Sequence, residues 1–126
     1  MKALKFFEEY IQEGIVKKVR INKERSKSLL IESERRMHSL KIKLEKLGVN
    51  NENANDYVEY CYNILADLIR AKLYLNGYST SGHGAHEAEV AYMRVLGFIE
   101  EEVQFADQMR YFRNGILYYG TILDKE

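Results

Sequence analysis

The chain has 126 residues, a length typical of one domain that buries a core without disulfide bonds. Cys61 is the only cysteine, so we expect no disulfide framework and no cysteine-based metal site, and a reducing, cytoplasmic setting is favoured. We find no segment with the pattern of a signal peptide and no apolar run near the ~20 residues of a membrane span. The sequence therefore predicts neither export nor insertion into a membrane.

The formal net charge is zero, but the charges are unevenly distributed along the chain. Residues 1–46 carry thirteen positive and seven negative side chains, and residues 47–126 carry six and twelve. The densest basic run, residues 17–27, could meet phosphates, an anionic membrane or an acidic partner. No aromatic side chains interleave with it as they would on a surface for single strands, so we interpret it as a solvated face.

The absence of proline and the placement of most glycines between amphipathic segments predict a nearly all-helical chain. The 3 and 4 spacing of apolar residues predicts a first helix that includes Gly14, followed by two long helices separated by a polar turn after Gly48. A glycine-rich loop and Gly97 separate two further helices. The predicted helices cover residues 3–20, 22–47, 52–75 and 85–96, with a last helix whose first turn holds Glu100, Glu101 and Glu102.

Two long helices joined by a short turn, followed by a shorter and a longer helix, predict an all-α fold. The expected architecture is an antiparallel up-and-down bundle of four principal helices plus an N-terminal helix, which would cross the bundle or contribute to a homodimer. Cys61 falls in register with apolar positions and is interpreted as a small core residue. The ten tyrosines and five phenylalanines favour self-association.

An Arg113-Asn114 pair interrupts the apolar face of the last helix, which indicates either a buried structural network or a binding site. In the structural alternative, Arg113 pairs with Asp107 or with glutamates. Arg113 and Tyr118 lie about 140° apart on a straight helix. A shared site would therefore need a distortion at Gly115 or a two-fold axis that brings two copies together.

Three segments carry a resemblance to a known family: ALKFFEEYIQEGIVKK at residues 3–18, AKLYLNGYSTSGHGAHEA at 71–88 and MRYFRNGILYYG at 109–120. Their order resembles the HEPN domain family, specifically its small stand-alone prokaryotic members, over residues 1–126 as one domain. The resemblance implies a helical bundle that often dimerises, with an arginine motif in a cleft at the dimer interface. Many members are metal-independent ribonucleases, toxins paired with a nucleotidyltransferase antitoxin, or nucleotide-binding modules.

The chain departs from the catalytic signature of that family, which is arginine, four to six residues, then histidine. Counting from Arg113, the corresponding positions hold Tyr118, Tyr119 and Gly120. Tyrosine titrates near 10, so at neutral pH it donates hydrogen bonds but is a poor general base. The resemblance implies Arg113 and Asn114 as contacts to a phosphate or base, and Tyr118 stands where the histidine would be. Tyr118 and Tyr119 are further candidates for binding a ligand.

A second polar cluster holds His83 and His86, three residues apart, with Glu87 and Glu89 beside them. The spacing is not the HExxH zinc pattern, and no further ligand follows at a fixed distance, so neither a metal site nor a cofactor is expected. If His83 or His86 reaches Arg113 in space, it could act as a displaced acid or base.

The sequence leaves three functions open. The leading one is a HEPN-like nucleotide- or RNA-binding module, dimeric, with degenerate or no ribonuclease activity and with a nucleotidyltransferase as partner. The second is a metal-independent ribonuclease that uses His83 or His86 as its base. The third is a non-catalytic helical protein-interaction dimer, whose tyrosines form the interface. Binding to nucleic acid should weaken steeply with salt, whereas an aromatic protein interface should not.

Overall fold

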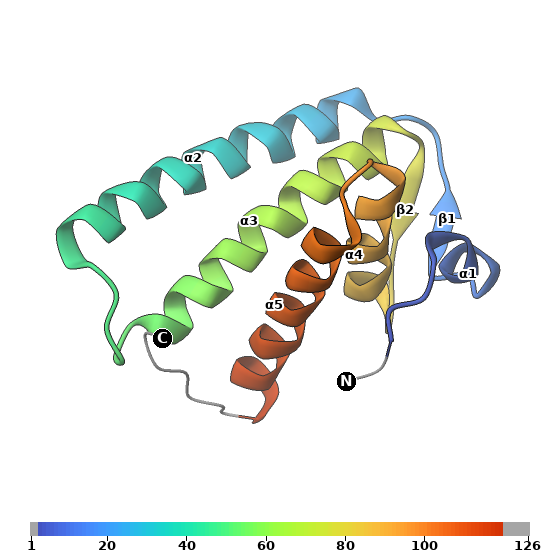
Figure 1. The fold of residues 1–126 in the computed structure, drawn as a ribbon. Coiled ribbons are helices and arrows are strands. Elements are labelled where there is room, and N and C mark those ends of the chain that lie inside the picture. The colour runs from blue at the N-terminus through green and yellow to red at the C-terminus, as the bar shows by residue number, and fades with distance from the viewer. Residues whose placement is uncertain (1–2, 120–126) are drawn as a thin grey trace.

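The computed structural model describes residues 3–119, with side chains up to Gly115 (Figure 1). Most of this range is helical, as predicted, and its strands form one two-stranded sheet. None of the described helices combines the length and apolar character needed to cross a membrane. The elements are α1 (Phe7–Gln12), β1 (Val16–Lys18), α2 (Lys23–Leu47), α3 (Ala54–Leu75), β2 (Tyr78–Thr80), α4 (Ala85–Val95) and α5 (Glu100–Tyr119).

The N-terminal segment corrects the predicted helix over residues 3–20. Helix α1 ends before Gly14, whose φ of +78° is a left-handed conformation that residues other than glycine rarely adopt. The chain then forms β1, which pairs antiparallel with β2, with Val16 opposite Thr80. Pairing with a distant segment decides the conformation here, and helical spacing within residues 3–20 carries no information about that partner.

Helix α1 is anchored to α4 within the same chain. Phe7 and Tyr10 are buried, and the Phe7 ring lies 4.7 Å from the ring of Tyr92 on α4, between centroids. Arg94 of α4 also donates a hydrogen bond of 2.8 Å to the backbone carbonyl of Lys5. The N-terminal segment is therefore part of the core of one chain.

The α2–α3 hairpin confirms the two predicted long helices to within two residues. The side chain of Asn22 accepts the backbone N–H of Arg25 at 3.0 Å and so caps α2. Gly48, with φ +64°, ends it. Cys61 on α3 is only partly buried, so its predicted core position is wrong.

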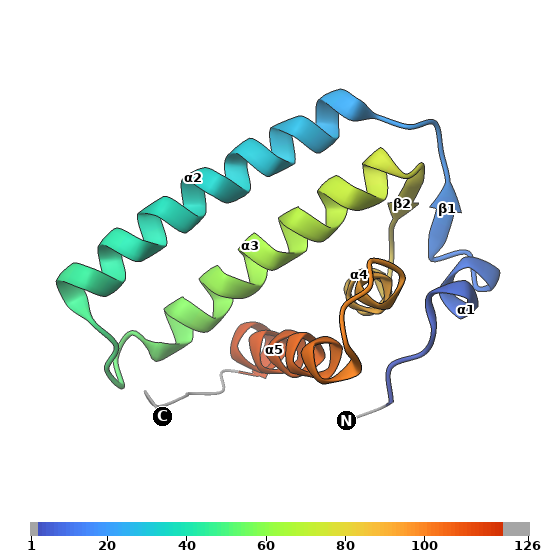
Figure 2. The ribbon, with the colours of Figure 1, turned by 45° about the horizontal axis from the view of Figure 1, so that its top comes forward.

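Helix α3 lies at the centre of the fold and packs against α2, α4 and α5. Figure 2 shows α2 and α3 side by side along their lengths, whereas α4 and α5 are seen nearly end-on. The two pairs cross, and the predicted up-and-down bundle of four principal helices is not confirmed. A physical reason is the burial of α4, which carries six consecutive buried residues from Ala88 to Met93 and is covered by α1 as well as by α3 and α5.

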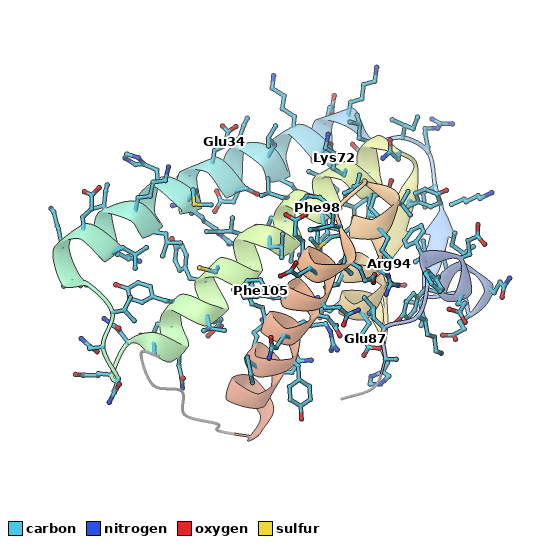
Figure 3. All side chains as sticks on the ribbon, viewed as in Figure 1. Glu34, Lys72, Glu87, Arg94, Phe98 and Phe105 are labelled. Atoms are coloured by element: carbon cyan, nitrogen blue, oxygen red, sulfur yellow. The ribbon has the colours of Figure 1, made fainter. Side chains whose placement is uncertain are left out.

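An open apolar surface remains where α5 passes α3. Two adjoining hollows of about 560 and about 420 Å³ share Leu65, Met93 and Phe98. Phe98 is 44% exposed and Phe105 64%; Figure 3 shows Phe105 on α5 and Phe98 in the segment just before that helix. We call this surface the apolar groove; its apolar lining includes Leu30, Leu65, Leu68, Leu75, Met93, Leu96, Phe98, Ile99, Phe105 and Met109.

Candidate functional site

Arg113 of α5 lies over the ring of Tyr62 of α3. The guanidinium Cζ atom is 5.5 Å from the centroid of the ring, a cation–π distance. The Nε atom is buried and has no hydrogen-bond partner among the residues whose side chains are described. None of the ion pairs between described residues includes Arg113. In the described part of the chain, its charge is therefore not balanced by a carboxylate.

Asp107, which the structural alternative assigned to Arg113, pairs with Arg110 instead. Arg110 Nε donates a hydrogen bond of 2.8 Å to Asp107 Oδ1, and Arg110 Nη1 lies 3.7 Å from Glu87 Oε1. Both members of the Asp107–Arg110 pair are buried. The Oδ2 atom of Asp107 is buried, and no described residue donates a hydrogen bond to it. The charge of Arg110 is thus balanced internally, which sets it apart from Arg113.

Tyr62 connects the arginine of α5 to the histidine of α4. Its side chain is 1% exposed, and its buried hydroxyl has no hydrogen-bond partner in the described part of the chain. Burial, and secondly the charge of Glu89, raise the pKa of Tyr62 well above the usual value, so the phenol stays protonated at neutral pH. The ring of His86 meets the ring of Tyr62 edge-on at 6.1 Å between centroids. Arg113 and His86 therefore contact the same aromatic ring.

A buried carboxylate orients His86. The Nδ1 atom of His86 lies 3.1 Å from Oε1 of Glu89, a residue that is 2% exposed. Burial alone would raise the pKa of Glu89, but hydrogen bonds from His86, Arg70 and Thr80 together hold it below the usual value. Glu89 is therefore a carboxylate at neutral pH and accepts the Nδ1 proton, which leaves Nε2 of His86 as the basic nitrogen.

Alternating charges link this histidine to α2. Arg36 Nη1 donates to Asp67 Oδ2 at 3.0 Å, and Arg70 Nη1 donates to Asp67 Oδ1 at 3.4 Å. Arg70 Nε in turn donates to Glu89 Oε2 at 2.8 Å. We call Arg36, Asp67, Arg70, Glu89 and His86 the charged network. This network connects α2, α3 and α4 and fixes the position of the imidazole.

The remaining predicted site residues are not brought into this cluster. His83 lies exposed in the loop before α4, and the half-buried side chain of Asn114 makes no hydrogen bond with another described residue. Tyr118 and Tyr119 belong to α5, but their side chains lie outside the described residues. No group of three or more histidine, cysteine, aspartate or glutamate side chains in the described part of the chain is placed to hold a metal ion.

Sequence reasoning did not identify Tyr62, Arg70 or Asp67 as part of the site. Asp67 and Arg70 are three residues apart on α3, as are His86 and Glu89 on α4. Side chains at this spacing are neighbours on a helix, so each pair is readable from the sequence. The junction between the pairs depends on the packing of α3 against α4, which the sequence pattern does not give.

Comparisons with known proteins add no assignment. No family model, no curated protein and no solved structure matches this chain. The contacts of Arg113 and His86 and the resemblance of the three sequence segments are therefore the basis for a proposed function.

Proposed function

We propose that this chain is a HEPN-like nucleotide- or RNA-binding module, with degenerate or no ribonuclease activity, in which Arg113 binds a phosphate. The observation that supports this function is the guanidinium of Arg113, which lies on Tyr62 and has no carboxylate partner among the described residues. A guanidinium suits phosphate oxygens because it presents paired N–H donors. The ring of Tyr62 supports the guanidinium from below, and the resemblance adds Asn114 and Tyr118 as orienting residues, with Tyr119 as a further ligand contact.

RNA binding across a salt series, in EDTA, tests this proposal. Arg113→Ala should weaken binding by about tenfold or more, because it removes a charge-assisted contact. Arg35→Ala is the matched control, since Arg35 is an exposed arginine of α2 outside the cluster. Binding that is insensitive to salt, or equal losses in the two variants, would refute a specific phosphate contact at Arg113.

A metal-independent ribonuclease is the second candidate, and the orientation of His86 favours it. Nε2 of His86 would take the proton of a ribose 2′-hydroxyl while that oxygen attacks the adjacent phosphorus and the 5′ oxygen leaves. The imidazolium would then return the proton to the leaving oxygen. Arg113 would balance the charge of the phosphate. His83 is the weaker base candidate because its side chain is exposed and makes no hydrogen bond or ion pair with another described residue.

Cleavage of RNA in EDTA decides between binding and catalysis. Catalysis predicts that His86→Ala abolishes cleavage while RNA binding persists, and that His83→Ala cleaves normally. Cleavage that survives His86→Ala would exclude His86 as the base, and absence of cleavage by the unmodified chain would leave the binding module.

A homodimer is the second part of the proposal, and the apolar groove is where we place its interface. A large exposed apolar surface is typical of a protein interface. Glu101 and Glu102 border the groove on α5, while Lys72 borders it on α3. A two-fold axis would set the acidic border of one copy against the basic border of the other, so the charges favour a second copy of this chain.

The resemblance also implies a partner protein for the dimer. It would be a nucleotidyltransferase, as in toxin–antitoxin pairs, in a cytoplasmic setting. The apolar groove equally supports a non-catalytic interaction dimer, in which Arg113 would have only a structural role. Salt-dependent RNA binding that requires Arg113 would separate the binding module from that alternative.

A further inference from the structure

A separate cavity lies beside His86, between the start of α2, the C-terminal half of α3, β2 and the start of α4. Its volume is about 300 Å³, at the lower end of the range of small-molecule sites. Arg113 does not line it. The polar and aromatic lining includes Arg25, Arg70, Tyr74, Tyr78, Ser79 and His86.

The cavity carries an unbalanced positive charge at Arg25. Its guanidinium lies 5.0 Å from the centre of the Tyr74 ring, and none of the ion pairs between described residues includes it. Stacking fixes the plane of a guanidinium while its edge keeps free N–H donors.

Glu89 is the one carboxylate of the lining, and both of its oxygens are already engaged. Arg70 and Thr80 donate to Oε2, at 2.8 Å each, and His86 lies 3.1 Å from Oε1. Its charge is offset by Arg70, so the electrostatic balance of the cavity favours an anion.

The start of α4 adds to this balance. Ala85 and His86 line the cavity, and the residue before them, Gly84, provides no side chain to cap the first N–H groups of the helix. The N–H of Ala85 already donates to the carbonyl of Gly82 at 3.2 Å, so the next N–H groups and the dipole of an eleven-residue helix favour negative charge at that end. They supplement the guanidinium of Arg25, and the two tyrosines supply flat apolar walls.

We propose that this cavity binds a phosphate monoester attached to an aromatic group, either a free mononucleotide or the end of an RNA chain. A monoester carries about two negative charges at neutral pH, which suits Arg25 together with the start of α4. The aromatic part would lie against Tyr74 or Tyr78. The site shares no arginine with the phosphate contact proposed at Arg113, so each can fail without the other.

Calorimetric titration with adenosine monophosphate, adenosine and inorganic phosphate tests the proposal. We expect the monophosphate to bind at least tenfold more tightly than adenosine, and inorganic phosphate to compete with it. Arg25→Gln, which keeps a polar side chain of similar length, should weaken the monophosphate by about tenfold or more. Lys27→Ala, a neighbouring exposed cation outside the cavity, should change it less than twofold.

Two outcomes would overturn the proposal: equal binding of adenosine and its monophosphate, or equal losses in Arg25→Gln and Lys27→Ala. Thermal unfolding of each variant shows whether a loss reflects the site or the fold. Arg113→Ala should leave monophosphate binding unchanged even where it abolishes RNA binding. Finally, RNA oligonucleotides with a 5′-phosphate or a 5′-hydroxyl separate the sources: tighter binding of the phosphorylated chain, lost in Arg25→Gln, assigns the cavity to an RNA end.

Discussion

The Nδ1 atom of His86 lies 3.1 Å from Oε1 of Glu89, so a buried carboxylate determines which nitrogen of the imidazole carries the proton. Arg70 neutralises that carboxylate through a 2.8 Å hydrogen bond. Glu89 consequently supports the fold and orients the histidine, and the two roles can be tested separately.

Glu89→Gln should lower the free energy of unfolding by about 2 kcal/mol, because the variant leaves the guanidinium of Arg70 with a neutral partner. The expected loss of stability is modest because the side chain of Arg70 is 32% exposed to solvent. Urea denaturation measures it, with Glu87→Gln as the control. Glu87 lies two residues away and is more exposed, so its variant should stay within about 0.5 kcal/mol of the parent.

The same carboxylate predicts a pH dependence. The folded chain holds the pKa of Glu89 below its usual value of 4.5, so its stabilising effect is present above pH 4.5 and is lost as pH falls through the lowered pKa. The free energy of unfolding, measured between about pH 7 and pH 3, should fall less steeply in Glu89→Gln than in the parent chain. Identical slopes below pH 4.5 would contradict the assigned charge of Glu89.

Tyr62→Phe removes only the buried hydroxyl and keeps the ring that Arg113 contacts. Removing a buried hydroxyl that has no partner among the described residues should leave the free energy of unfolding unchanged or raise it by up to about 1 kcal/mol. RNA affinity should stay unchanged, because the variant keeps the ring that Arg113 contacts and the removed hydroxyl is buried. Tyr92→Phe is the matched control: the Tyr92 hydroxyl accepts a 2.6 Å hydrogen bond from Asn76, so its loss should cost about 1 kcal/mol. A stability loss of similar size in Tyr62→Phe would indicate that its hydroxyl is satisfied in solution.

Phe105→Asp should convert the proposed dimer to a monomer, because it places a charge in the apolar groove. Light scattering coupled to size-exclusion chromatography gives the mass, and circular dichroism shows whether the helices persist. Ile31→Asp is the control, since Ile31 is also exposed but lies outside the groove lining. If both variants remain dimers, the interface lies elsewhere; if the parent chain is a monomer, no dimer forms.

The long helices could be predicted from local sequence signals, whereas the elements that depend on long-range pairing could not. The Asn22 cap and Gly48 mark the ends of α2 in the sequence itself. By contrast, the residues after Gly14 keep an apolar spacing compatible with a helix, yet Val16 pairs with Thr80. The crossing of α4 and α5 over α3 likewise depends on how side chains pack, which periodicity leaves open.

The candidate site could likewise be predicted only in part from the sequence. Arg113 and His86 were identified as candidates because their residue types suit phosphate and proton transfer. Their common contact, Tyr62, belongs to a third helix and was missed because it fits an ordinary apolar position. The choice between His83 and His86 likewise required the position of Glu89, which the fold turns toward His86.

The alternating charges from Arg36 to His86 constrain how this sequence can change in evolution. Each member of the charged network satisfies the one before it, from α2 through α3 to α4. A natural replacement at Arg36 would leave Asp67 partly unpaired and would have to be answered by a change at the next position. We therefore expect these residues to covary among homologous sequences, so that the residue at position 36 on α2 changes together with the histidine on α4.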